Sequence, residues 1–328
     1  MANYTEPFQA VLDYAWPKIQ FNAYNSKENT LLLWLRKNCI HTVGGFGEYI
    51  RIPIQYGHTD DSTNLAADPY DTISTTAISD QDALKFQNAA FALPIIGSNY
   101  EIEVKVGTDK NRIYDYWKSK TTTRAKAAQR ILSDGLFGEG GGSTTYTQTD
   151  ILGLRTHIDE TDTTYGALTR SDANTYGLWP VQDTTTTTVT WGALINAVMD
   201  CSGDTEALFT TKDIMGFIWV MRQAQERYDP TPKGKIFQDV GAEYINLSGR
   251  PIVWDHRCPP YHIFGLAANN GSGEQCIHYF QHRSWDLTAE KIVDNTEKQE
   301  VRVGRIKWAG QLCFSRVDNQ FAFTGITA

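Results

Sequence analysis

The chain has 328 residues and a formal net charge of −8 at pH 7. With 41% hydrophobic and 21% charged residues it has the composition of a folded protein, and its acidity disfavours a general nucleic-acid binder, which works through a basic surface. No run of about 18 apolar residues and no export leader is present, and the 5 scattered cysteines form no CxxC pair, so we expect a soluble, unexported protein with free thiols.

Residues 1–25 predict an extended arm, because Pro7 and Pro17 interrupt any helical period. Ser26 is then expected to cap a short helix. The apolar run at 31–35 predicts that this helix is largely buried, and the two bases that follow suit a helix C-terminus.

Residues 45–97 predict a long two-stranded excursion. Apolar residues at every second position of 49–56 indicate an outgoing strand, and Pro53 makes it an edge strand. A polar tip leads to a second extended run at 84–96. Because a lone hairpin has no second layer to cover its apolar face, we expect it to rest on the body of the chain or on another subunit.

The most prominent predicted element is one long helix over 108–137, with Thr108 as N-cap and Gly135 just past its end. The three threonines at 121–123 can mark a bend. Between 104 and 133 there are eight bases and only two acids, a net charge of +6 within an acidic chain. This pattern is typical either of an ordinary solvated helix face or of a basic rib that faces an acidic partner.

Residues 138–150 are glycine-rich and predict a linker before a new domain near Leu152. Helices and strands then alternate, which indicates an α/β domain. The expected helices are 191–199 and 213–228, and the expected strands are 207–210, 242–247, 250–254 and 261–266. A tight turn at 248–249 joins two of these strands, and from 277 onward the chain is mostly strand.

One group of residues mixes the ligand types of a zinc site: His256, Cys258, Cys276, His278 and His282. Their spacing matches no metal module that we can name, so structural or surface roles are favoured over a bound metal. A metal-dependent soluble enzyme that uses this cluster stays as the alternative of a different class. No GxSxG, HExxH, GxGxxG or lysine-bearing phosphate loop occurs, so no catalytic residue is predicted and a structural protein is favoured.

The order of these parts resembles the major capsid proteins of tailed bacteriophages, with the Hong Kong 97-type fold. Short stretches add to the resemblance at TVGG (42–45), SDGLF (133–137), LGL (152–154), VGAEY (240–244) and WAGQL (308–312). The resemblance implies an α+β fold in five parts. These are an N-terminal arm and short helix (1–44), an extended loop (45–97), a peripheral domain with a spine helix (98–151), an axial domain (152–277) and returning peripheral strands (278–328).

The resemblance further implies that hexamers and pentamers form an icosahedral shell around phage double-stranded DNA, packaged without sequence specificity. Assembly would take place in the host cytoplasm and the product would be the virion. The implied partners are other copies of the chain, a separate scaffolding protein, a portal and, as an optional addition, decoration proteins. No membrane, metal or cofactor is implied.

Two sets of residues would then lie at subunit contacts. The extended loop would contact neighbours through Ile50, Arg51, Ile52, Tyr56, Phe86 and Phe91. Shell assembly would supply the layer that covers its apolar face from the neighbouring subunit. The basic spine face would line the inner wall or meet acidic surfaces through Lys118, Lys120, Arg124 and Lys126. An encapsulin-like nanocompartment, which has the same fold, is the alternative kind of shell.

Overall fold

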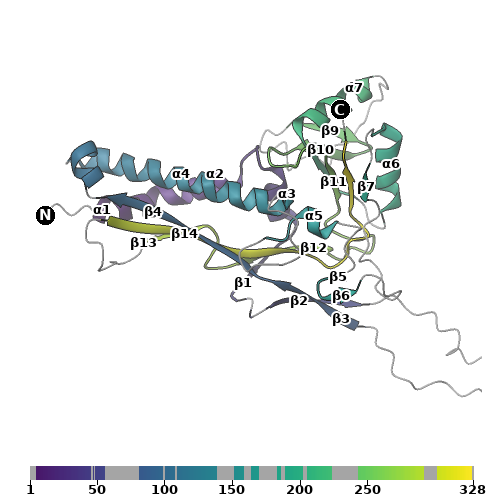
Figure 1. The fold of residues 1–328 in the computed structure, drawn as a ribbon, viewed down its shortest axis with the longest axis horizontal. Coiled ribbons are helices and arrows are strands. Elements are labelled where there is room, and N and C mark those ends of the chain that lie inside the picture. Colours follow the sequence, from purple (N-terminus) through teal and green to yellow (C-terminus); the bar gives the residue numbers. More distant parts are fainter. Residues whose placement is uncertain are drawn as a thin grey trace, which may run out of the picture.

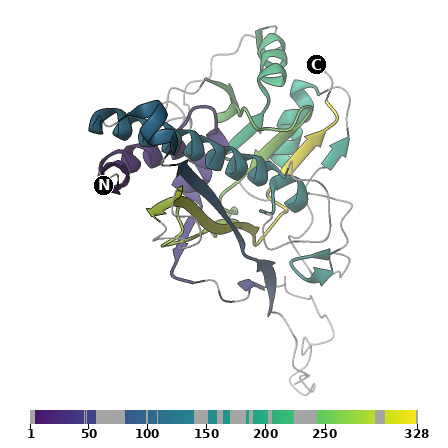
Figure 2. The same cartoon turned by 60° about the vertical axis from the view of Figure 1, so that its left-hand side comes forward.

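The computed structural model describes residues 5–45, 47, 49–55, 81–98, 100–107, 109–138, 151–158, 164–169, 183–185, 189–201, 205–223, 243–291 and 301–326. An elongated body is built on a long helix and a sheet, and a more compact body lies beside one end of it (Figure 1). Figure 2 shows the same two bodies after a turn of 60°. No described helix is both long enough and apolar enough to cross a membrane.

The N-terminal segment is helical, and the expected extended arm is wrong. It consists of α1 (Thr5–Ala10), the π-helical turn η1 (Val11–Ala15) and α2 (Trp16–Tyr24). Both prolines lie in the first turn of a helix, where a missing N–H costs no intrahelical hydrogen bond. Phe8, Val11 and Trp16 are buried, because the segment packs along the long helix α4.

The short helix α3 (Thr30–Asn38) follows, and all five apolar residues at 31–35 are buried as predicted. Its N-cap is Asn29 rather than Ser26. The Ser26 hydroxyl instead accepts a hydrogen bond from the Glu28 N–H at 3.2 Å, one turn before the helix begins.

A five-stranded sheet forms one layer of the elongated body, and α4 lies over it (Figure 1). Its central strand β14 (Val301–Phe314) is long enough to pair with three other strands. The remaining strands are β1 (Ile40–Val43), β4 (Ala89–Ser98), β12 (Ile277–His282) and β13 (Thr288–Lys291). β4 and β14 pair antiparallel over ten positions, from Ser98 opposite Val301 to Ala89 opposite Gly310.

The predicted hairpin exists, but its return run is split. β2 (Tyr49–Gln55) pairs antiparallel with β3 (Gln81–Gln87). The extended run is interrupted at Asn88, which belongs to no strand. After it, β4 leaves the hairpin and joins the five-stranded sheet. The polar tip at 56–80 lies outside the described residues.

The predicted long helix is α4 (Lys110–Phe137), and it runs through all three threonines as one helix. Thr122 and Thr123 donate their hydroxyls to the carbonyls of Lys118 and Ser119, one turn earlier, at 2.8 and 3.0 Å. Two expected ends differ. Asp109 is the N-cap, since its side chain accepts from the Asn111 N–H, and Thr108 lies outside the described residues.

The C-terminal end of α4 also lies further along than expected. Gly135 is inside the helix, and the left-handed cap is Gly138, with φ of 82°. Because Gly153 approaches the backbone of Gly138 and Gly135 so closely that a Cβ would overlap it, the chain returns to this helix end after the glycine-rich segment. That segment itself, 139–150, lies outside the described residues. Before the helix, the π-helical turn η3 (Glu101–Val106) follows β4.

The compact body holds a six-stranded mixed sheet. Its strands, in spatial order, are β7 (Asp183–Thr185), β15 (Phe321–Thr324), β11 (Ile263–Leu266), β8 (Ala207–Thr210), β10 (Arg250–Trp254) and β9 (Tyr244–Leu247). Helices α6 (Trp191–Asp200) and α7 (Lys212–Gln223) pack on it, and their buried residues form a second apolar core. A short helix α5 (Leu154–His157) and the small hairpin of β5 (Thr164–Tyr165) and β6 (Leu168–Thr169) precede this body.

Most local predictions in this body are confirmed. β8 and β10 have the expected bounds, α6 ends one residue later, and α7 covers the described part of the helix expected at 213–228. Ser248 and Gly249 have φ of 50° and 87°, as a tight hairpin turn requires. One assignment differs, because β15 pairs with β11 in this sheet instead of returning to the elongated body.

Candidate assembly surfaces

The long helix α4 is fixed by one apolar face that rests on the sheet and on the N-terminal helices. Ile113, Trp117, Ala125 and Leu132 on this face are buried, whereas Arg124 is exposed. The rings of Trp117 and Phe8 meet with centroids 4.6 Å apart. The apolar face therefore holds α4 rigidly and leaves its other sides open.

The four bases of the predicted basic face do not all lie on one side of this helix. Lys120 forms an ion pair with Glu101 of η3 at 3.3 Å and lies over the Tyr116 ring. Lys126, six residues on and so about 120° around the helix, lies beside α2 instead. Lys118, Arg124 and Lys126 are exposed, and no acid among the described residues pairs with them. Their role at an inner wall or a neighbouring subunit stays a prediction.

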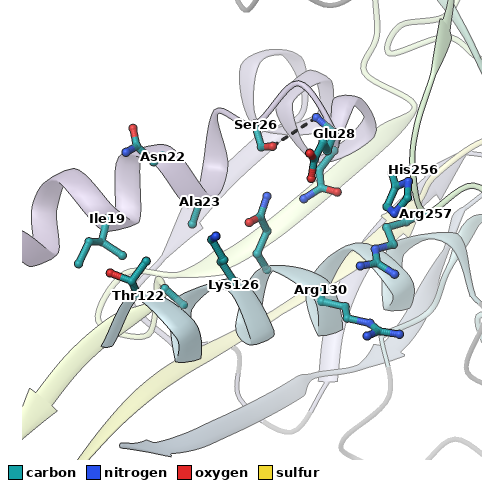
Figure 3. Close-up of a pocket in the computed structure, with 13 residues that line it drawn as sticks. Ile19, Asn22, Ala23, Ser26, Glu28, Thr122, Lys126, Arg130, His256 and Arg257 are labelled. Atoms are coloured by element: carbon teal, nitrogen blue, oxygen red, sulfur yellow. Dashed lines mark hydrogen bonds between the residues drawn. The ribbon is translucent and has the colours of Figure 1, made fainter. Parts of the chain in front are cut away.

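A groove of about 480 Å³ lies between α2 and α4 (Figure 3). Ile19 and Ala23 of α2 and Ala125 of α4 give it an apolar lining. Arg257, from the turn after β10, closes one end, so the groove lies where the two bodies meet. We name this feature the α2–α4 groove.

The charge of the α2–α4 groove is mainly basic. Lys126, Arg130 and Arg257 line it, and Glu28 is the one acid among its described lining residues. Arg130 and Arg257 share the carboxylate of Asp134, at 3.4 and 3.5 Å. Lys126 has no such partner among the described residues, and it rises from α4 toward α2 (Figure 3).

The hairpin of β2 and β3 has an apolar face that this chain itself covers. Ile50 lies opposite Phe86 and Ile52 opposite Leu84, so these four share one face. All four are buried, at most 6% exposed. The covering layer is the β5–β6 hairpin: the Gly166 carbonyl accepts from the Lys85 N–H at 2.9 Å.

Our expectation that another subunit supplies this layer is therefore wrong for the described part of the hairpin. The rings of Phe86 and Tyr165, 5.5 Å apart, belong to segments separated by the whole of α4, and no local pattern links them. Of the other predicted loop contacts, Arg51 is exposed and available to a neighbour, and Tyr56 lies outside the described residues. Phe91 is half-buried and stacks on Trp308 of β14 at 5.4 Å.

Comparisons with known proteins find similarity in structure alone. No protein-family model and no curated protein matches the sequence. Solved structures do match along most of the chain. The cyanophage A-1(L) capsid asymmetric unit is 12% identical, with 92% of this chain and 93% of that chain covered and a TM-score of 0.61.

Two further solved structures match to a similar extent. A chain of Mycobacterium phage Patience is 14% identical, with 97% and 88% of the two chains covered and a TM-score of 0.54. The SrpI encapsulin of Synechococcus elongatus PCC 7942 is 8% identical, with 90% and 87% covered and a TM-score of 0.59. The chain has the Hong Kong 97-type capsid fold.

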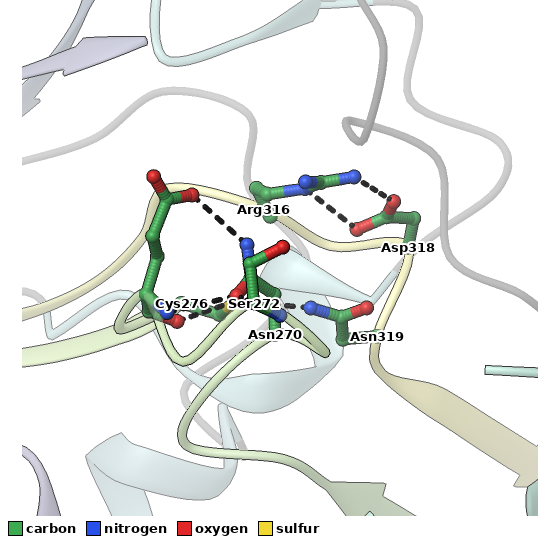
Figure 4. A network of polar contacts seen from close by, with 7 residues as sticks. Asn270, Ser272, Cys276, Arg316, Asp318 and Asn319 are labelled. Atoms are coloured by element: carbon green, nitrogen blue, oxygen red, sulfur yellow. Dashed lines mark hydrogen bonds and ion pairs between the residues drawn. The ribbon is translucent and has the colours of Figure 1, made fainter. Parts of the chain in front are cut away.

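The capsid fold does not gather the five histidines and cysteines that mix zinc-ligand types. Buried Cys276 accepts a hydrogen bond from the Asn319 amide at 2.9 Å (Figure 4), and its burial raises the pKa of the thiol to about 11. His278 contacts His41 at 3.1 Å, and burial, then the charge of His41, lowers the pKa of His278 to about 4. Within the described residues no three or more potential ligands are arranged to hold a metal ion.

The other members of this group lie elsewhere in the capsid fold. Cys258 is buried after β10, His256 lines the α2–α4 groove, and His282 accepts from the Ser284 N–H at 3.1 Å. The network around Cys276 has a structural role instead. It ties the connection between β11 and β12 to the connection between β14 and β15, and in each of these connections the chain passes from one sheet to the other (Figure 4).

Sequence reasoning missed a buried carboxylate that joins the two bodies. Asp255, just after β10, accepts from the Leu31 N–H at 3.0 Å and the Arg257 N–H at 2.9 Å, and from the Thr30 hydroxyl. Leu31 lies in the first turn of α3, where the helix dipole favours a negative charge. Burial nevertheless raises the pKa of Asp255 to about 6. One aspartate in a polar turn carries no sequence signal for this position.

His157 was missed for the same reason. It is buried and stacks on Phe314 at 4.5 Å. Its Nε2 lies 3.0 Å from the Leu312 carbonyl, which can only accept, so Nε2 carries the proton and Nδ1 accepts from the Tyr165 hydroxyl at 2.6 Å. His157 thereby fixes the segment that covers the β2–β3 hairpin.

Proposed function

We propose that this chain is the major capsid protein of a tailed bacteriophage. Copies of it assemble as hexamers and pentamers into a closed icosahedral shell around double-stranded DNA. A separate scaffolding protein, a portal and decoration proteins are the partner classes that this function implies, and the assembled product is the virion, formed in the host cytoplasm. The role is structural, and no catalytic residue takes part.

The observation that carries this proposal is the similarity to phage capsid chains over nearly the full length of both partners. At 92% and 93% coverage, the cyanophage match extends over the helices, both sheets and their connections rather than over one domain. Because fold alone does not fix function, the assembly surfaces carry the rest of the argument. Two features are ones that a neighbouring copy would use: Lys118, Arg124 and Lys126 of α4, which are exposed and pair with no acid among the described residues, and a hairpin that projects from the body (Figure 1).

The test is assembly of the purified full-length chain, alone and with the other proteins encoded beside it. We expect negative-stain images to show closed particles of uniform diameter. A chain that stays a monomer in sedimentation, under all conditions of salt and concentration and with these proteins present, would contradict the proposal.

An encapsulin-like nanocompartment is the second candidate, favoured by the similarity to the SrpI encapsulin. The two functions differ in what the particle contains. A phage shell recovered from infected cells holds double-stranded DNA that nuclease cannot reach. A nanocompartment holds a cargo protein in fixed proportion to the shell subunit, which mass spectrometry of purified particles would find.

A further inference from the structure

Two histidines meet on one face of the five-stranded sheet. His41 of β1 lies opposite Phe280 of β12, and His278 is two residues before Phe280, so all three side chains share this face. His41 Nε2 and His278 Nδ1 are 3.1 Å apart, whereas the ring centroids are 5.1 Å apart, so these two nitrogens face each other. Because 237 residues separate the pair in sequence, only the fold brings it together.

The hydrogen bonds of His278 assign the proton to one of its two nitrogens. The Ser315 hydroxyl lies 3.1 Å from the Gln275 carbonyl and 3.2 Å from the Cys276 carbonyl, which can only accept, so its single hydrogen is donated there. Ser315 Oγ therefore accepts from His278 Nε2–H, at 3.2 Å. His278 Nδ1 is left with a lone pair that points toward His41. A histidine that binds a metal ion usually has its other N–H held by a hydrogen bond of this kind.

The separation of the facing nitrogens suits one ion between them. Two facing lone pairs repel each other, so either a proton or a metal ion must lie between these atoms. Two imidazole nitrogens that are each about 2.0–2.1 Å from one tetrahedral zinc ion are about 3.3–3.4 Å apart, within about 0.3 Å of the separation here. The Phe280 ring, with its centroid 5.3 and 5.9 Å from those of the two histidines, supports both rings in this position.

We propose that His41 and His278 together bind one divalent transition-metal ion of the class that prefers imidazole ligands, such as Zn²⁺ or Cu²⁺. No third described residue is arranged to join them, so this is an open site in which water completes the coordination, and not the closed four-ligand site of a structural zinc. Both side chains are half-buried, and the ion would tie the edge strand β1 to β12. The inference goes beyond the proposed function and does not depend on whether shells form.

Titration of Zn²⁺ into the full-length chain tests the site by calorimetry. The chain is purified without a histidine tag and freed of metal with a chelator. We expect saturable binding that His41→Gln and His278→Gln each weaken by about tenfold or more, because each removes one of two ligands. His282→Gln is the matched control. His282 lies on the same strand but accepts from the Ser284 N–H instead, so this variant should bind zinc as the unchanged chain does.

Ser315→Ala separates an assembled site from two histidines that bind independently. It keeps both ligands but removes the acceptor that orients His278, and we expect it to weaken binding by about tenfold to a hundredfold. Cu²⁺ identifies the ligands directly. Electron paramagnetic resonance with less than one equivalent of Cu²⁺ should show two coordinated imidazole nitrogens in the unchanged chain and fewer in His41→Gln.

Unfolding in urea shows whether the ion binds the folded chain. Because the two histidines meet only in the folded state, saturating Zn²⁺ should raise the unfolding midpoint of the unchanged chain and of His282→Gln, but not that of His41→Gln. The midpoint of each variant without zinc shows that the variant is folded.

Three outcomes would overturn the inference. They are no saturable binding of zinc, unchanged binding in His41→Gln, or an equal loss of binding in His282→Gln. Failure of the proposed function is seen separately, as a chain that never forms particles.

Discussion

Trp117 and Phe8 can pack against the sheet because two glycines lie beneath them. A Cβ at Gly97 would overlap the Trp117 indole, and a Cβ at Gly304 would overlap the Phe8 ring. The two glycines lie on the paired strands β4 and β14, so the aromatic pair joins α1, α4 and the sheet at one point. This contact depends on the absence of side chains at two positions that no helix or strand pattern identifies.

Gly97→Ala should therefore destabilise the chain by about 1–3 kcal/mol, the usual cost of an overpacked core. Urea unfolding of the unassembled subunit measures it. Gly216→Ala is the control, because nothing lies near that position of α7 and alanine favours a helix, so stability should stay equal or rise. Equal unfolding midpoints for Gly97→Ala and the unchanged chain would contradict this account of the contact.

Asp255 makes the stability of the chain depend on pH. Its pKa is about 6 in the folded chain and about 3.9 when unfolded, so between these values the folded state holds a proton that the unfolded state releases. Its contribution is fully present below about pH 4 and is lost as pH rises through 6. Asp255→Asn removes this dependence and also places the amide NH2 group against one of the two backbone donors, Leu31 or Arg257, which should cost about 1–3 kcal/mol.

Urea unfolding at pH 4.5 and at pH 7 measures both effects. The change in stability between these two pH values should differ between the unchanged chain and Asp255→Asn by the contribution of this one carboxyl group. The same change with pH in both proteins would show that Asp255 does not titrate in this range.

At the scale of elements, the sequence predicted those helices and strands whose pattern is local. Patterns of neighbouring residues are enough to predict the helical period of α4, the bounds of β8 and the turn at Ser248 and Gly249. The helical form of 5–24 was missed, because a proline in a first turn and a proline that breaks a helix look alike in sequence. The covering of the β2–β3 hairpin and the place of β15 could not be read from the sequence, since both depend on partners far along the chain.

The described part of the β2–β3 hairpin belongs to the core of the subunit, and we expect the connecting residues 56–80 to act in assembly. Replacing 57–79 by a short Gly-Ser turn should leave a folded subunit, because the buried residues of β2 and β3 remain, and this subunit should form no closed shells. Hydrogen exchange should show the amides shared between β2 and β3 protected in the isolated subunit. Normal shells from the shortened chain would contradict the role given to the tip.

We expect the exposed bases of α4 to act on assembly and not on folding. Reversing Lys118 and Arg124 to glutamate should lower particle yield or DNA content, with the free energy of unfolding changed by no more than about 0.5 kcal/mol, as for most surface substitutions. Lys37 and Lys212 are exposed on α3 and α7. Changing both to glutamate alters the net charge of the chain by the same amount, so it serves as the control for an effect of net charge alone. Normal yield and DNA content in the α4 variant would refute this role.

For the whole molecule, buried polar contacts join segments that lie where the chain passes between the two sheets. The buried side chain of Gln320 accepts from the Ala267 N–H at 2.8 Å and donates to its carbonyl at 2.9 Å, as a neighbouring strand would. Asp255 makes a second link, from β10 to α3. A subunit of fixed shape is what a closed shell of many equivalent copies requires.

Cryo-electron microscopy of particles formed by the full-length chain tests this account most directly. It predicts closed icosahedral shells in which pentamers lie on the five-fold axes and hexamers fill the surface between them, with α4 and the β2–β3 hairpin of each copy in contact with neighbours. Filaments, sheets, or a shell in which the hairpin contacts only its own subunit would contradict it.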